Sequence, residues 1–236
     1  MHPERTPLAG KTAGACTRRP PDMSESPPSN RPERIRRLLR PAAIALLVTA
    51  VALIVLIASG AFDPKPKGAF LHTDYPGTLE QDRVGEQIVE LEPPWPADSP
   101  PERFSVRLAA TQVAGDLDSG YGLALAGKGG RLVVAVSPLG YVAVREEKAG
   151  GQTVDLIPWS TWPHVRMGEA ANEIWLDVDG DGGRTVITAS VNRETLWRGE
   201  KAWSPERVGL WSAGFGGRTE VDFRSLEWFA EPADQR

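Results

Sequence analysis

Residues 172–191 read NEIWLDVDGDGGRTVITASV, and this stretch decides the fold class. Apolar side chains alternate with others from Ile174 to Val178, and a second strand-like run covers residues 185–191. Asp and Gly residues fill the connection between the two runs. Period-two alternation beside such a connection is typical of an antiparallel hairpin. The stretch therefore predicts two neighbouring strands of a sheet.

The same kind of pattern fills the chain from residue 104 onward. Further strand-like segments are separated by Gly, Pro and Asp clusters, and they cover residues 104–108, 120–125, 132–137, 141–145, 153–157, 208–212 and 221–223, with one more at 84–91. No window of helical length keeps a period of 3.6 residues there, which argues against βαβ units. Short strands with turn residues between them predict an all-β antiparallel sandwich or barrel.

Small motifs placed along these strands resemble a known family. In chain order they are Tyr121-Gly122-Leu123, Leu139-Gly140-Tyr141, Pro158-Trp159, Gly168, Asn172 to Leu176, Val191-Asn192, Val208 to Trp211 and Val221-Asp222-Phe223. Their order resembles the concanavalin A-like jelly rolls of the laminin-G and 3-keto-disaccharide hydrolase-like type, common as extracytoplasmic domains of bacteria. Arg193 stands where that family has the Gly of a V-N-G motif, and Arg224-Ser225 stands where it has D-N. The resemblance implies an antiparallel jelly-roll β-sandwich, a shape shared by lectins, glycosidases and spacers.

An apolar segment precedes the predicted strands. Residues 42–58 read AAIALLVTAVALIVLIA, without charge or Pro, and a helix from Ala42 to Phe62 would be ~31 Å long. That length crosses the ~30 Å hydrocarbon core of a bilayer. Five arginines precede the segment, at positions 31, 34, 36, 37 and 40. The positive-inside rule therefore predicts a single-pass membrane protein with a cytoplasmic N-terminus and an extracytoplasmic C-terminal domain.

A cleaved signal peptide is the alternative interpretation of this segment. The small residues Ser59, Gly60 and Ala61 would suit a cleavage site. The apolar run is longer than the about 7–15 residues of a signal, and a long hydrophilic stretch precedes it, so a retained anchor is favoured. The expected organisation is a disordered basic tail over 1–40, a transmembrane helix over 41–62, an extracytoplasmic linker over 63–82, a β-sandwich over 83–231 and a C-terminal tail over 232–236.

Charge and cysteine content narrow the function classes. Residues 1–40 carry nine Lys and Arg against four Asp and Glu, a net charge of +5, whereas the remaining residues carry 18 against 27, a net charge of −9. The basic tail suits either topology determination or contact with anionic lipid headgroups. The acidic remainder argues against a nucleic-acid partner, which requires a basic surface. Cys16 is the single cysteine, so the outer domain has no disulfide and depends on its core.

Asp177, Asp179 and Asp181 stand at alternate positions before a Gly, like the first ligands of a calcium loop. Position twelve of such a loop would be Thr188 instead of a bidentate Glu. A connection between two strands is also expected to be rich in Asp and Gly. The hairpin interpretation is therefore favoured, calcium remains the alternative, and no other cofactor is expected.

Four of the eight tryptophans are candidate ligand-binding residues. Trp175 and Trp211 alternate with expected core positions and are predicted to face away from the core. Trp159 and Trp162 are predicted to lie in a loop after residue 157. Exposed indole rings suit sugar stacking and interfaces, and the alternative is that they pack against the second sheet or cover a hairpin.

No catalytic residue is assigned. Glycoside cleavage requires two carboxylates at ~5–9 Å, and no short segment forces that geometry on the candidates Glu169, Glu173, Asp177 and Asp179. His164 has no accompanying G-x-S-x-G motif. We expect a non-catalytic, membrane-anchored module that binds carbohydrate or another ligand, such as a protein. The alternatives are a glycoside-processing enzyme of the 3-keto-disaccharide hydrolase-like kind and a purely structural accessory domain.

Overall fold

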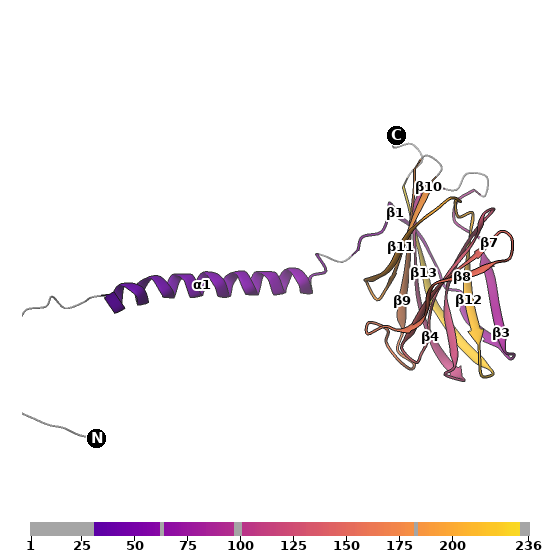
Figure 1. Cartoon of the computed structure of the whole chain (residues 1–236), viewed down its shortest axis with the longest axis horizontal. Coiled ribbons are helices and arrows are strands. Elements are labelled where there is room, and N and C mark those ends of the chain that lie inside the picture. Colours follow the sequence, from indigo (N-terminus) through magenta and orange to yellow (C-terminus); the bar gives the residue numbers. More distant parts are fainter. Residues whose placement is uncertain (1–30, 62–63, 97–100, 182–183, 232–236) are drawn as a thin grey trace, which may run out of the picture. The chain divides into compact units, whose positions relative to one another are not determined.

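The computed structural model of the chain describes residues 31–61, 64–96, 101–181 and 184–231. The chain forms two compact units, Met1–Ala61 and Phe62–Arg236. The first contains one long helix and the second contains the strands (Figure 1). The predictions made for residues 1–30, for Phe62 and for residues 232–236 lie outside the described residues.

Helix α1 covers Arg31–Ala58 and includes the apolar segment. Within it, Pro41–Ala58 is long and apolar enough to cross a membrane by length and composition. Every side chain from 41 to 58, Ala42 included, is exposed. A helix that is apolar on all sides requires an apolar environment, because water disfavours such a surface.

Both ends of α1 differ from the prediction. The helix begins at Arg31, so residues 31–40, predicted as part of the disordered tail, are helical, as the helix-forming Arg, Glu and Leu residues there favour. It ends at Ala58 because Gly60 has a φ of 69° and closes a Schellman motif. In that motif the Gly60 N–H donates to the Ile57 carbonyl at 3.1 Å and the Ala61 N–H donates to the Leu56 carbonyl at 3.2 Å.

The described strands form two antiparallel sheets, which confirms the predicted jelly-roll β-sandwich (Figure 1). The seven-stranded sheet has the order β1 (Ala69–Asp74), β13 (Thr219–Ala230), β4 (Arg103–Gly115), β9 (Asn172–Asp181), β10 (Arg184–Val191) and β11 (Glu194–Lys201), with β2 (Gly77–Gln81) also paired to β13. The six-stranded sheet has the order β3 (Gly85–Leu91), β12 (Arg207–Gly214), β5 (Ser119–Gly127), β6 (Gly130–Val136), β7 (Tyr141–Lys148) and β8 (Thr153–Thr161).

One apolar core lies between the two sheets. Period-two alternation sends every second side chain inward, and both sheets contribute. The largest fully buried members are Phe104, Leu108, Tyr121, Leu123, Leu125, Leu132, Ile174, Leu176, Ile187, Phe223 and Trp228. Burial of each such aliphatic or aromatic side chain contributes about 1.5–3 kcal/mol to folding, so this core replaces the missing disulfides as the source of stability.

The sandwich begins before residue 83, the start expected from the sequence. Strands β1 and β2 lie within the stretch predicted as a linker, and both pair with β13. The Trp228 indole N–H also donates to the Asp74 carboxylate at 2.7 Å. Most of the β1 side chains remain exposed, so the strand shows no alternation by which the sequence could have indicated it.

Strand β11 was also missing from the sequence prediction, and the turn before it explains why. Asn192 and Arg193 join β10 to β11, with φ angles of 50° and 73°. Val191 pairs directly with Glu194, so the hairpin has the two-residue loop with positive φ that a type I′ turn requires. Asn-Gly is the usual sequence signal for this turn, and Arg193 replaces its Gly. The arginine therefore occupies a strained left-handed conformation.

Replacing Arg193 with Gly is expected to raise the free energy of unfolding by about 1 kcal/mol, because Gly adopts positive φ without a Cβ clash. Urea unfolding of the full chain in detergent micelles measures the change. Arg193→Ala is the matched control, since it removes the same side chain and keeps the Cβ. An equal gain in the Ala variant would contradict the explanation by backbone strain.

Candidate functional site

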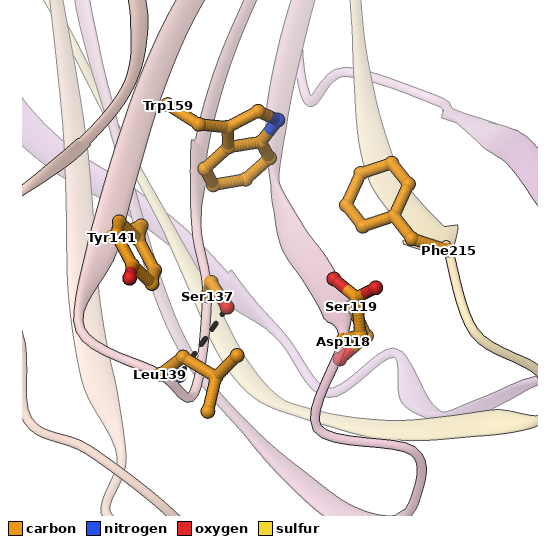
Figure 2. A pocket seen from close by; sticks show the side chains of 7 residues that line it. All are labelled: Asp118, Ser119, Ser137, Leu139, Tyr141, Trp159 and Phe215. Atoms are coloured by element: carbon orange, nitrogen blue, oxygen red, sulfur yellow. Dashed lines mark hydrogen bonds between the residues drawn. The ribbon is translucent and has the colours of Figure 1, made fainter.

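A pocket with a volume of about 290 Å³ lies at one end of the six-stranded sheet (Figure 2). Its lining comes from the start of β5, the turn between β6 and β7, the last part of β8 and the residue after β12. These segments meet because neighbouring antiparallel strands begin and end at the same edge. The lining residues are Asp118, Ser119, Ser137, Leu139, Tyr141, Trp159 and Phe215.

Trp159 occupies its place because Gly120 has no side chain. A Cβ added at Gly120 would lie 2.8 Å from Cη2 of Trp159 and 3.1 Å from Cζ3 of Trp211. The Trp159 ring centroid lies 6.4 Å from that of Trp211 and 5.9 Å from that of Phe215. Trp159 nevertheless remains 39% exposed. Its ring is thus supported by the sheet and its neighbours and still presents apolar surface to the pocket.

Trp211 faces away from the sandwich interior, as predicted, but it is buried and does not offer the exposed ring that ligand binding requires. Only 1% of it is exposed, because it packs in a second apolar cluster with Ala124, Val133, Ala135 and Ala213 on the outward face of the sheet. Trp211 therefore supports Trp159 from below the pocket surface and does not itself line the pocket.

An ion pair holds the outer side of Trp211. The Trp211 indole N–H donates to the Glu86 carboxylate at 3.3 Å, and the Arg145 guanidinium carbon lies 5.9 Å from the ring centroid. Arg145 also donates to Glu86 through both terminal nitrogens, one of them at 2.6 Å. Burial works to raise the pKa of Glu86, but the hydrogen bond and the charge of Arg145 lower it overall. The carboxylate is thus held ionised beside the indole.

The structure does not bring the four candidate tryptophans together. Trp175 lies on the seven-stranded sheet and is only 5% exposed, with the Arg107 guanidinium 5.4 Å from its ring centroid. Trp162 is half-buried, packs against the core and lies 5.8 Å from the His164 ring. Trp159 lies in β8 instead of the predicted loop. Of the four, Trp159 alone lines the pocket, and the buried Trp175 does not offer the exposed ring that ligand binding requires.

The aspartates proposed for calcium lie on strand β9, whose pairing with β10 confirms the predicted hairpin. Asp177 is buried and accepts a hydrogen bond from the Ser105 hydroxyl. Asp179 forms ion pairs with Arg103 at 2.8 Å and with Lys67 at 3.5 Å. Within the described ranges, no three His, Cys, Asp or Glu side chains are grouped to hold a metal.

Asp177 and Asp179 therefore have protein partners, whereas Asp181 is exposed at the end of the strand. Calcium binding stays a prediction.

A buried polar network, which sequence reasoning missed, positions the turn that carries three pocket residues. The Asn172 side chain is 1% exposed; its Nδ2 donates to the Tyr121 hydroxyl at 2.9 Å and its Oδ1 accepts from Asn192 Nδ2 at 2.7 Å. Asn172 anchors the segment 162–168. In that segment the N–H groups of Gly168 and Trp162 donate to the carbonyls of Pro138 and Gly140, respectively. Those contacts fix the turn that contributes Ser137, Leu139 and Tyr141 to the pocket.

No protein-family profile and no curated protein sequence matches this chain. Among solved structures it is similar to an apo Crh5 transglycosylase, with a TM-score of 0.44, 9% identity and coverage of 72% of this chain and 89% of that one. It is also similar to Caenorhabditis elegans galectin LEC-6, with a TM-score of 0.36, 15% identity and coverage of 63% and 94%.

A third similar structure is the binding domain of botulinum neurotoxin DC in complex with SialylT, with a TM-score of 0.41 and 10% identity. That match covers 72% of this chain, and this chain spans only 43% of the neurotoxin chain. At these identities the likeness concerns the fold alone.

Replacing Asp177 with Asn is expected to change how stability depends on pH. Burial raises the pKa of Asp177, against the opposing effects of the Ser105 hydrogen bond and the Lys67 charge. A raised folded-state pKa contributes stability below the unfolded-state pKa of about 3.9, and this contribution is lost as the pH rises through the folded-state value. The wild type should therefore lose stability relative to the variant as the pH rises from about 3, below the unfolded-state pKa, through the folded-state pKa toward neutrality.

Urea unfolding of both proteins across this range measures the difference. Asp181→Asn, on the same strand, is the control and should not produce the change. A difference between wild type and Asp177→Asn that stays constant, or that grows in favour of the wild type as the pH rises, would contradict the assignment.

Proposed function

We propose that this chain is a membrane-anchored, non-catalytic module whose β-sandwich binds a saccharide in the pocket beside Trp159. The observation that carries the proposal is a partly exposed indole ring, fixed by the sheet, next to hydroxyl and carboxylate groups in one pocket (Figure 2). Such a pocket offers both kinds of surface that a sugar ring presents, apolar C–H faces and polar edges.

The aromatic side of the pocket would receive the apolar face of the sugar. Tyr141 and Phe215, 37% and 39% exposed, join Trp159 in the lining. Rings held in place by packing lose little conformational freedom on binding, so their contact area contributes more fully to affinity. Leu139 extends the same apolar surface.

The polar side of the pocket would receive sugar hydroxyls. Ser137 accepts a hydrogen bond from the Leu139 N–H at 3.3 Å, which leaves its own hydroxyl proton to donate. The Tyr141 hydroxyl and the Asp118 carboxylate add a donor and acceptors. Ser119 contributes less, because its hydroxyl donates to Gln112 Oε1 and is buried.

The pocket supports binding better than hydrolysis. Asp118 is the only carboxylate among the described residues that line it, whereas glycoside cleavage requires a pair of carboxylates at ~5–9.5 Å across the scissile bond. The candidate carboxylates Glu173 and Asp179 lie on the other sheet. Glu173 pairs there with Arg107, and Asp179 pairs with Arg103 and Lys67.

The anchor part of the proposal rests on α1. The exposed stretch Pro41–Ala58 would be ~27 Å long as a helix, close to the thickness of a bilayer core. Residues 59–68 then connect it to β1, the first strand of the sandwich. The proposed location is the cell membrane, with the sandwich outside.

Trp159→Ala is expected to weaken saccharide binding on the order of tenfold, because it removes the main stacking surface. The full chain, recovered in detergent micelles from carbonate-washed membranes, is applied to a glycan array, and affinities for retained glycans are then measured by titration. Tyr75→Ala is the control, since Tyr75 is 77% exposed, follows β1 and lies outside the pocket lining.

Gly120→Ala provides a second variant that keeps every lining side chain. Its Cβ would displace the Trp159 ring, so binding should also weaken. Retention of no glycan by the wild type, or unchanged affinity in both Trp159→Ala and Gly120→Ala, would contradict the proposed function. Loss of the chain from membranes during the carbonate wash would contradict the anchor.

A further inference from the structure

We infer that the saccharide bound by this pocket carries a free amine, so that the ligand is a cationic amino sugar. This inference rests on the proposed function and concerns the charge of the pocket. Among the described lining residues Asp118 is the only charged one, and its charge is negative.

The backbone of Asp118 is fixed in position, and its carboxylate is not neutralised. The Asp118 N–H donates to Asp116 Oδ1 at 3.0 Å, and the Asp118 carbonyl accepts from the N–H groups of Phe215 and Gly216 at 2.9 and 3.3 Å. These three bonds hold its backbone. Within the described part of the chain, its side chain has neither a hydrogen bond nor an ion pair. A ligand cation would therefore meet an unpaired carboxylate carried by a fixed stretch of backbone.

Three aromatic rings reinforce the preference for a cation. Tyr141, Trp159 and Phe215 lie around the space into which the Asp118 side chain projects (Figure 2). The face of an aromatic ring attracts an ammonium group, most strongly for Trp. Arg145 does not neutralise Asp118, since it pairs with Glu86 and Glu147 and lies over Trp211. Rings and carboxylate thus favour the same ligand charge.

The rest of the pocket favours an amino sugar over an isolated ammonium group. A volume of about 290 Å³ leaves room for a ring beyond the cation. The hydroxyls of Ser137 and Tyr141 would face groups that a lysine side chain lacks. The same ammonium chemistry could come from a lysine side chain of a protein. The experiment below separates the amino sugar from the lysine-bearing protein.

The test compares three β-1,4-linked tetrasaccharides that differ only at carbon 2 of each ring, where they carry a hydroxyl, an acetamido group or a free amine. The full chain in detergent micelles is titrated with each at about pH 6, at which the amine is protonated. We expect the amine form to bind roughly three- to tenfold more tightly than the hydroxyl form, with a preference that decreases at high salt.

Asp118→Asn should reduce this preference to within about twofold, while the affinity for the hydroxyl form changes little. Asp116→Asn is the matched control, because it removes a neighbouring charge and keeps an oxygen that can accept the Asp118 N–H bond. The control should retain the preference.

Four outcomes would overturn the inference. Equal binding of the three sugars would contradict it and leave the proposed saccharide function standing, whereas binding of none, together with an empty glycan array, would contradict both. An amine preference that survives in Asp118→Asn would show that Asp118 does not cause it. Binding of a lysine-containing peptide without binding of the amino tetrasaccharide would identify a protein ligand instead.

Discussion

The position of Trp159 depends on a missing side chain, that of Gly120 on the outward face of β5. A methyl group there would meet the rings of both Trp159 and Trp211 at 3.1 Å or less. Small residues continue on the same outward face at Ala124, Ala135 and Ala213, and they leave room in which Trp211 is buried outside the main core. The site is thus built on the outer surface of the sheet because the strands carry little bulk there, and the pocket inherits the rigidity of the sheet beneath it.

The remaining pocket residues come from turns, and interactions elsewhere in the fold position those turns. Asn172 and Asn192 form a buried polar network that fixes the segment packed against the turn of Leu139, and a network of this kind is specific because each unsatisfied member would be costly. Asp118 is held by its backbone next to Phe215. Long-range pairing therefore brings residues about a hundred positions apart in sequence into one pocket.

Period-two alternation made the fold predictable, and its absence marks what the sequence could not show. The strands predicted at Ile174 to Val178 and Thr185 to Val191 were confirmed, because apolar side chains at alternate positions face the core. Strand β1 was not predicted because most of it is exposed. Strand β11 was not predicted because Arg193 occupies a turn position at which Gly is the usual sequence signal. Trp175 and Trp211 face outward as alternation requires, yet both are buried by charged and small neighbours on other strands, which local sequence does not reveal. Trp159 was the one predicted ligand residue placed in the pocket, and the turn residues around it carried no local signal of their meeting.

The proposed function depends on a sugar ring packing against Trp159. The most direct measurement is the indole ¹⁵N–¹H spectrum of the full chain in micelles during titration with the amino tetrasaccharide, since each of the eight tryptophans contributes its own signal. The signal of Trp159 should move most, that of Trp211 beneath it should follow, and those of Trp175 and Trp228 on the other sheet should stay in place. Saturable binding that leaves the Trp159 signal unchanged, or that moves Trp175 instead, would contradict the account.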